Sequence, residues 1–108
     1  AVESRLFGLE KRMERSLEIV VYRIIQELIS NVLKHAQASE LSVTVTRATG
    51  RLSVMVSDDG KGFDASESSV GMGMENVRSR AASIGALLRV DSTPGKGTTV
   101  SMEAPVLE

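Results

Sequence analysis

Apolar side chains recur every three to four positions between residues 16 and 36, a spacing that predicts a long amphipathic helix. Its stripe consists of Leu17, Val20, Val21, Ile24, Ile25, Leu28, Val32 and Ala36. Ser16 is expected to cap this helix, because a serine hydroxyl accepts from a free backbone N–H of the first turn. A shorter repeat predicts a second helix that ends at Gly85, a residue suited to a left-handed stop. The apolar positions of this second helix are Met74, Val77, Ala81 and Ile84.

Four segments alternate between apolar and polar residues, the period of a half-buried strand. They cover residues 41–47, 51–57, 86–91 and 98–104, and the last two form a hairpin around the turn at 93–97. Residues 1–15 are charged and irregularly apolar, so we expect a short helix or a lead-in from an upstream region. The rest, 16–108, is expected to form one α+β domain, a two-layer sandwich with helices on one face of a mainly antiparallel mixed sheet. The pattern leaves the order of strand pairing open.

Composition excludes several kinds of chemistry. The chain has no cysteine, which removes disulfides, thiol catalysis and cysteine-based zinc sites, and its single histidine rules out a two-histidine metal motif. A formal net charge of −1 gives no general grip on nucleic acid, and no apolar run reaches the ~20 residues that span a bilayer. We therefore expect no nucleic-acid partner and no direct membrane contact. Because the chain begins at Ala1 without a methionine, it is expected to be a fragment or a processed product.

A polar row borders the apolar stripe of the first helix. At about 100° per residue, Glu27, Asn31, Lys34 and His35 fall within one sector of roughly 100°. One interpretation is a solvated helix edge, with His35 packed structurally. The other is a phosphate and metal site, in which the Asn31 oxygen ligates magnesium and Lys34 neutralises phosphate. Glu27 would then orient or deprotonate a nucleophile, or hold a magnesium-bound water.

The strand over 51–57 runs directly into Asp58, followed by Gly60 and Gly62. An aspartate fixed at a strand end accepts hydrogen bonds only, and glycines let backbone approach a ligand closely. Adenine presents an amino donor where guanine presents a carbonyl acceptor, so Asp58 would favour adenine. The alternative is a turn aspartate, a role for which Asp59 is the better candidate.

Two further glycine-rich segments have a functional and a plain interpretation. The run Gly71-Met72-Gly73-Met74 precedes the second helix, where backbone N–H groups receive phosphate, but such runs are also ordinary loops. The polar segment 64–70 before it suits either a mobile lid or a solvated loop. Thr98 follows the 93–97 turn and would support Asp58 or the base; otherwise this segment is simply a hairpin turn.

Taken in order, these segments resemble the ATP-binding catalytic domain of bacterial sensor histidine kinases, within the gyrase, Hsp90, histidine kinase and MutL ATPase superfamily. The helix Tyr22–Ala36 is similar to the N box, more narrowly that of the nitrate-sensor and lipid-fluidity-sensor kinase subfamily. Residues 58–63, 71–76 and 97–99 are similar to the three glycine boxes. The resemblance covers about residues 15–105. It implies magnesium at Asn31, phosphates near Lys34 and His35, and adenine at Asp58. It also implies that Gly60, Gly62, Gly71 and Gly73 shape the pocket and lid.

The resemblance also implies partners. Such kinases carry a phosphoacceptor histidine on a separate dimerisation helix, whereas His35 lies inside the N-box-like helix. We therefore expect ATP and Mg²⁺ as ligands, the dimerisation domain of the same kinase as acceptor, and a response regulator downstream. The expected location is cytoplasmic, in a cytoplasmic sensor or the cytoplasmic part of a membrane-bound receptor. Two alternatives stay open: a nucleotide-responsive interaction module without catalysis, and a serine kinase of the anti-sigma type.

Overall fold

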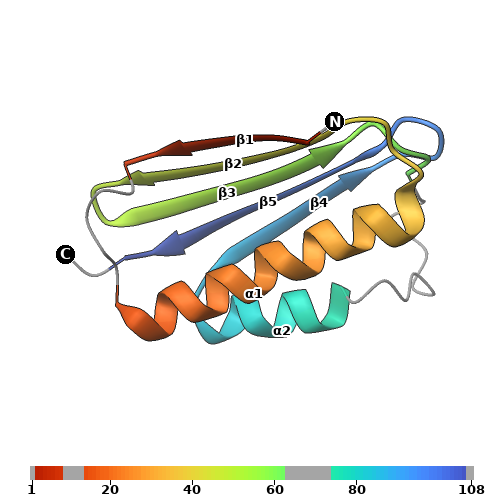
Figure 1. Cartoon of the computed structure of the whole chain (residues 1–108). Coiled ribbons are helices and arrows are strands. Elements are labelled where there is room, and N and C mark those ends of the chain that lie inside the picture. Colours follow the sequence, from red (N-terminus) through yellow and green to blue (C-terminus); the bar gives the residue numbers. More distant parts are fainter. Residues whose placement is uncertain (1, 9–13, 63–73, 107–108) are drawn as a thin grey trace.

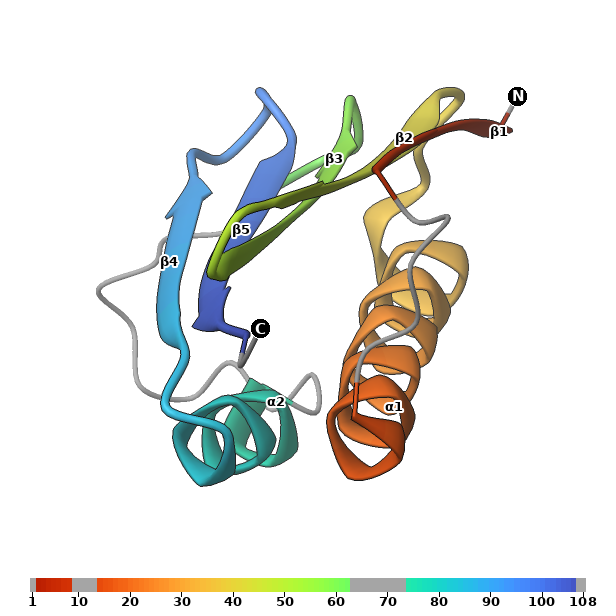
Figure 2. The same cartoon turned by 90° about the vertical axis from the view of Figure 1, so that its left-hand side faces the viewer.

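A computed structural model describes residues 2–8, 14–62 and 74–106 and shows two layers (Figure 1). Two α-helices lie against one side of a five-stranded sheet, and Figure 2 shows both on its concave side. The helices are α1 (Arg15–Asn31), continued by the π-turn η1 (Val32–Ala36), and α2 (Met74–Ser83). The strands are β1 (Val2–Phe7), β2 (Leu41–Ala48), β3 (Arg51–Asp58), β4 (Leu87–Ser92) and β5 (Thr98–Pro105).

The sheet is mixed, with the strand order β1-β2-β3-β5-β4. β1 runs parallel to β2, and the other three pairs are antiparallel. The predicted α+β sandwich is therefore confirmed, and the pairing order that the sequence left open is settled. None of the helices in the described part of the chain is long and apolar enough to cross a membrane.

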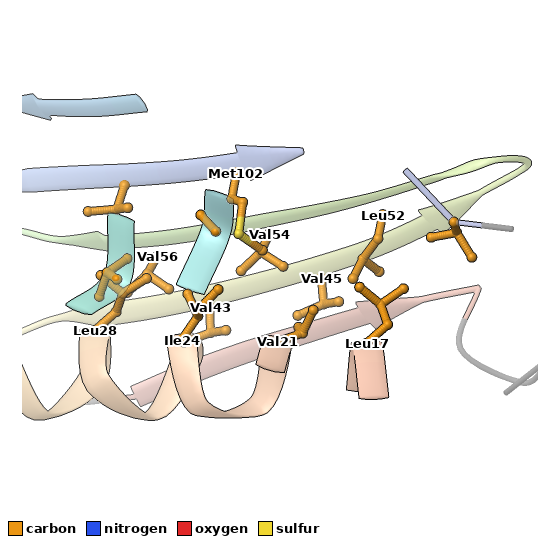
Figure 3. Packing of buried hydrophobic residues seen from close by; sticks show 14 of the residues in the cluster. Leu17, Val21, Ile24, Leu28, Val43, Val45, Leu52, Val54, Val56 and Met102 are labelled. Carbon is orange, nitrogen blue, oxygen red and sulfur yellow. The ribbon is translucent and has the colours of Figure 1, made fainter. Parts of the chain in front are cut away.

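One apolar core joins the two layers (Figure 3). From α1 the residues at three-to-four spacing point at the sheet, and Ile24 is fully buried at 0% exposure. The side chains at alternate positions of β2 and β3 pack against them from the sheet, and Leu52 is also fully buried at 0% exposure. The core residues that Figure 3 labels are Leu17, Val21, Ile24, Leu28, Val43, Val45, Leu52, Val54, Val56 and Met102.

The predicted end of the second helix is confirmed. Gly85, two residues after the end of α2, adopts a positive φ of 68°. Its N–H donates to the Ala82 carbonyl at 3.1 Å, and the Ala86 N–H donates to the Ala81 carbonyl at 2.9 Å. This pair of bonds is the Schellman motif, which satisfies the last carbonyls of a helix. The chain is thereby turned from α2 into β4.

Two predictions at the amino-terminal end were wrong. Of the two expectations for residues 1–15, the short helix is wrong over Val2–Phe7, which form strand β1 paired with β2 through residues 41–46, while the lead-in from an upstream region stays an expectation. Glu14, not Ser16, occupies the N-cap position of the first helix and makes no side-chain capping bond, and the Ser16 hydroxyl donates instead to the Glu14 carboxylate at 2.7 Å. The strand has a physical reason: β1 lies at the sheet edge, where backbone pairing suffices and side chains need no apolar period.

Candidate nucleotide site

The polar row on the first helix straddles a change in helix geometry. Glu27 and Asn31 lie in successive turns of α1 and are both half-buried, whereas Lys34 and His35 lie in η1. Lys34 is exposed, and the position of the His35 side chain lies outside what the structure describes. A π-turn shifts residues around the helix axis relative to α spacing, and such turns are frequent at functional sites. The row therefore splits into a half-buried pair on α1 and the exposed Lys34 on η1.

Asn31 contacts the start of the second helix. Its side-chain nitrogen lies 4.0 Å from the Met74 sulfur, a weak donor–acceptor contact across 43 residues of sequence. Met74 is itself packed against the core. With the amide nitrogen turned to Met74, the amide oxygen remains as the possible ligand atom. Gly71, Met72 and Gly73 lie outside the described residues.

Asp58 ends β3 with its carboxylate partly fixed. One oxygen accepts the Gly60 N–H at 2.8 Å, and the residues described offer the other oxygen no hydrogen bond. Asp58 is directly opposite Thr98 in the β3–β5 register. It continues the inward alternation of Leu52, Val54 and Val56, so it faces the helices from the end of the core. This arrangement leaves an acceptor at the boundary between core and solvent.

Asp59 plays the structural part that the sequence suggested for it. Its carboxylate accepts the Ser39 N–H at 2.9 Å, the Ser39 hydroxyl at 2.7 Å and the Glu40 N–H at 2.9 Å. These bonds, led by the one from the Glu40 backbone, hold the pKa of Asp59 below its ordinary value of 3.8. Asp59 thus ties the end of β3 to the segment that leads from η1 into β2.

This clamp predicts a pH-dependent contribution to stability. Because the folded state lowers the pKa of Asp59, its contribution is fully present above about pH 3.8 and is lost as pH falls through the lower folded value. We expect Asp59→Asn to unfold more easily than wild type at pH 7, with the difference shrinking at acid pH. Denaturant melts from pH 7 to pH 2.5 measure this. Asp91→Asn, which loses only an exposed pair with Arg89, is the control. A difference that is constant with pH would contradict the clamp.

Two glycines allow the first and third glycine-rich segments to pack backbone against backbone. A Cβ on Gly62 would lie 2.1 Å from the Thr93 carbonyl oxygen, and one on Gly97 would lie 2.2 Å from that of Asp58. The Gly95 N–H also donates to the Lys61 carbonyl at 2.6 Å. Gly62 therefore permits the close approach of the two loops, and Gly60 is buried and donates its N–H to the Asp58 carboxylate.

Gly97→Ala is expected to disrupt this packing. Gly95 and Gly97 share a positive φ, 80° and 85°, but Gly95 has open space around it. Gly95→Ala should therefore cost only the left-handed penalty of roughly 1–2 kcal/mol. Gly97→Ala should cost more and also weaken ATP binding, since Asp58 must move. Thermal unfolding and ATP titration of both variants test this. Equal destabilisation with intact binding would show that the close approach does not matter.

The candidate residues gather at one end of the sandwich. Residues 37–40 lead from η1 to Leu41 at the start of β2. Leu41 pairs with Asp58 on β3, and Asp58 pairs with Thr98 on β5. Figure 1 shows the last turn of the long helix, the end of β3 and the β4–β5 turn at the same end. A separate shallow hollow lies on the opposite sheet face, lined by outward residues including Thr44, Met55 and Arg89. None of the nucleotide-motif residues lines it, so it plays no part in this site.

Sequence reasoning missed one polar residue here. The Ser92 hydroxyl lies 2.7 Å from the Thr98 hydroxyl. Ser92 follows Leu88 and Val90 in the inward phase of β4, so the alternation contained the signal. Among the described residues no group of three histidine, cysteine, aspartate or glutamate side chains could hold a metal ion. The candidate site residues offer Mg²⁺ one amide oxygen, that of Asn31. A single protein ligand fits a Mg²⁺ ion whose other ligands are phosphate oxygens and water.

Comparison with known proteins identifies the class. The family described as histidine kinase-, DNA gyrase B- and HSP90-like ATPase matches residues 16–108. The chain belongs to this ATPase family.

Particular relatives are sensor kinases. The signal transduction histidine-protein kinase/phosphatase DegS of Brevibacillus brevis is 30% identical over 106 residues, which cover 97% of this chain and 28% of DegS. Sensor protein VraS of Staphylococcus aureus (strain COL) is 33% identical over 96 residues, covering 88% of this chain and 28% of VraS. The chain thus spans little more than a quarter of these relatives.

A solved structure shares the fold. The histidine kinase domain of the blue-light activated histidine kinase EL346 of Erythrobacter litoralis superposes with a TM-score of 0.78 at 23% identity. The match covers 98% of this chain and 55% of that one. The fold predicted from the sequence is the fold of a histidine kinase ATPase domain.

Proposed function

We propose that this chain is the ATP-binding catalytic domain of a two-component sensor histidine kinase. It would bind ATP with Mg²⁺ and transfer the γ-phosphoryl group to a histidine on a separate dimerisation domain of the same kinase. A response regulator would receive the phosphoryl group next. The observation that supports this most is that Asp58 and Thr98 are paired neighbours and lie at the same end of the sandwich as the last turn of α1, which carries Asn31.

Each residue has a role in this proposal. Asp58 accepts from the adenine amino group, with Thr98 beside it on β5. Asn31 is the protein ligand for Mg²⁺, which would neutralise phosphate charge during transfer. Lys34 extends from η1 to add positive charge there, with His35 next to it in sequence. Glu27, four residues before Asn31 on α1, orients the incoming nucleophile or a water.

The glycine-rich segments would form the rest of the pocket. Gly62 and Gly97 let the β3 end pack against the β4–β5 turn, and Gly60 would shape the pocket beside Asp58. The run Gly71-Met72-Gly73-Met74 would present backbone N–H groups to phosphate before α2. In the transfer the bond from the γ-phosphorus to its bridging oxygen breaks as a bond to the acceptor imidazole nitrogen forms, leaving ADP. Positioning and charge neutralisation supply most of the rate enhancement in such reactions.

Phosphotransfer to a purified dimerisation domain tests the proposal. γ-Labelled ATP, Mg²⁺ and this chain should label that domain on histidine, giving an acid-labile, base-stable phosphoryl group. Acid-stable phosphoserine on a small antagonist protein would instead support the anti-sigma-type kinase. Nucleotide binding with changed docking and no label on any partner would support the interaction module. In this proposal the reaction uses neither nucleic acid nor direct membrane contact and takes place in the cytoplasm.

The chain alone is expected to bind ATP or ADP with Mg²⁺ yet hydrolyse ATP slowly. The reason is that its motifs supply nucleotide ligands but its single histidine lies in the N-box-like helix. Adding the dimerisation domain should consume ATP in a stoichiometric burst of phosphohistidine. Calorimetry for binding and a phosphate-release assay for turnover check this. Vigorous steady-state phosphate release by the chain alone would contradict the requirement for a separate acceptor.

A further inference from the structure

The inner face of the sheet changes from apolar to polar in its last row. Three valines from β3, β5 and β4 form one buried or half-buried row: Val56, Val100 and Val90. Two residues nearer the turn, the same strands carry Asp58, Thr98 and Ser92 in register. All three are half-buried. Directly opposed residues in an antiparallel pair have Cβ atoms about 4.5–5.5 Å apart, so Thr98 lies between its two neighbours.

The Ser92 side chain contacts Thr98 and the backbone of Gly97, the residue before Thr98. Its hydroxyl lies 2.7 Å from the Thr98 hydroxyl and donates to the Gly97 carbonyl at 3.2 Å. A serine has one hydroxyl proton, and a carbonyl only accepts. When both bonds form together, the Ser92 proton lies on the Gly97 side, so Thr98 must donate its own proton to Ser92. Thr98 then presents only lone pairs to its other neighbours.

This proton arrangement changes what the row offers to a base. Either hydroxyl of the Ser92–Thr98 pair can donate; with Thr98 as the donor, the arrangement that the Ser92–Gly97 bond favours, Thr98 accepts from other groups as the Asp58 carboxylate does. The adenine amino group has hydrogens to donate, whereas guanine presents a carbonyl oxygen at the same edge. Two hydrogen-bond acceptors side by side therefore favour the adenine amino group and repel the guanine carbonyl oxygen. A Thr98 hydroxyl released from Ser92 could instead rotate and donate to guanine.

We infer that Ser92 is a specificity-determining residue that acts through Thr98, committing the Thr98 proton so that the site accepts from adenine and rejects guanine. This inference rests on the proposed ATP-binding function. Ser92 is a positioning residue, because it contacts Thr98 rather than the base. It predicts a change in base discrimination, which a residue that only stabilised the β4–β5 hairpin would not produce.

The test compares two hydroxyl pairs on opposite faces of the sheet. Ser57 and Thr99, each one residue from Asp58 and Thr98, form a hydroxyl pair at 3.0 Å on the outer face. Ser92→Ala should lower the ratio of ATP to GTP affinity about three- to tenfold, the size of one neutral hydrogen bond. Ser57→Ala should leave the ratio unchanged. Ser92→Thr, which keeps the hydroxyl, should retain most of the discrimination.

A double-mutant cycle completes the test. With Thr98→Val already in place, Ser92→Ala should not change the ATP-to-GTP ratio further, because Ser92 acts through the Thr98 hydroxyl. If Ser92→Ala does not fold, Ser92→Cys keeps the shape with a much weaker hydrogen-bonding group and should show the same loss. Ser92 and Ser57 variants with equal ratios would overturn the inference while ATP binding stands. A wild-type chain that binds neither nucleotide would overturn the proposed function itself.

Discussion

Asn31→Ala is expected to lower phosphotransfer about 10²–10³-fold, the range that follows loss of one preorganised electrostatic group. Asn31 is half-buried beside the apolar stripe of α1, and its amide nitrogen already contacts Met74, so its oxygen is the atom available to Mg²⁺. Because Asn31 borders the core without filling it, the variant should keep its fold. Initial rates of phosphohistidine formation across a Mg²⁺ titration measure the effect.

Gln26→Ala is the matched control for this variant. It removes another side-chain amide from α1, at an exposed position about 140° around the helix from Asn31. Gln26→Ala should transfer phosphoryl at the wild-type rate, and both variants should melt near the wild-type temperature. Wild-type transfer by Asn31→Ala at saturating Mg²⁺ would remove Asn31 from the metal-ligand role.

The apolar period carried most of the fold. Because α1 packs one stripe on the sheet, its register could be predicted from Leu17 to Leu28, and Ile24 is fully buried as that stripe requires. From the sequence Asp58 was expected only at the strand end, and in the structure it continues the alternation of β3 onto the inner face. Gly85 was predictable for a different reason, because a helix stop needs a left-handed residue. These features share a local cause that the sequence records.

Features without a side-chain period could not be predicted. In β1, residues 3–7 have exposed side chains, so pairing with β2 rests on backbone bonds that leave no apolar pattern. The π-turn after Asn31 adds a residue to a helical turn. Residues 32–36 contain no proline or glycine that would signal a departure from the α-helix. The contact from Asn31 to Met74 spans 43 residues and depends on how α1 and α2 pack. Tertiary placement decided each of these.

The candidate site divides along the same line. Residue types and order pointed to Asp58, Thr98 and Asn31, and strand register then showed that the first two are neighbours. Ser92 was overlooked because a serine before a Pro-Gly turn has an ordinary local explanation. Its contact with Thr98 emerges only once β4 pairs with β5. The roles of these residues toward nucleotide stay predictions.

Asp58→Asn is expected to weaken ATP binding roughly ten- to hundredfold, because a hydrogen bond to a charged group contributes about 1.5–3 kcal/mol. An amide can also donate to the guanine carbonyl, so discrimination against GTP should fall as well. The fold should persist, since the amide oxygen can still accept the Gly60 N–H. Calorimetric titration of ATP and of GTP against the wild type and Asp58→Asn measures the ATP affinity and the ATP-to-GTP ratio. Asp59→Asn is the control: its amide oxygen can still accept the Ser39 and Glu40 N–H groups, but it loses the charge and the second oxygen that accepts the Ser39 hydroxyl, and it should keep the ATP-to-GTP ratio. If Asp58→Asn retains wild-type ATP affinity and the same ratio, Asp58 is a turn residue and the base is recognised elsewhere.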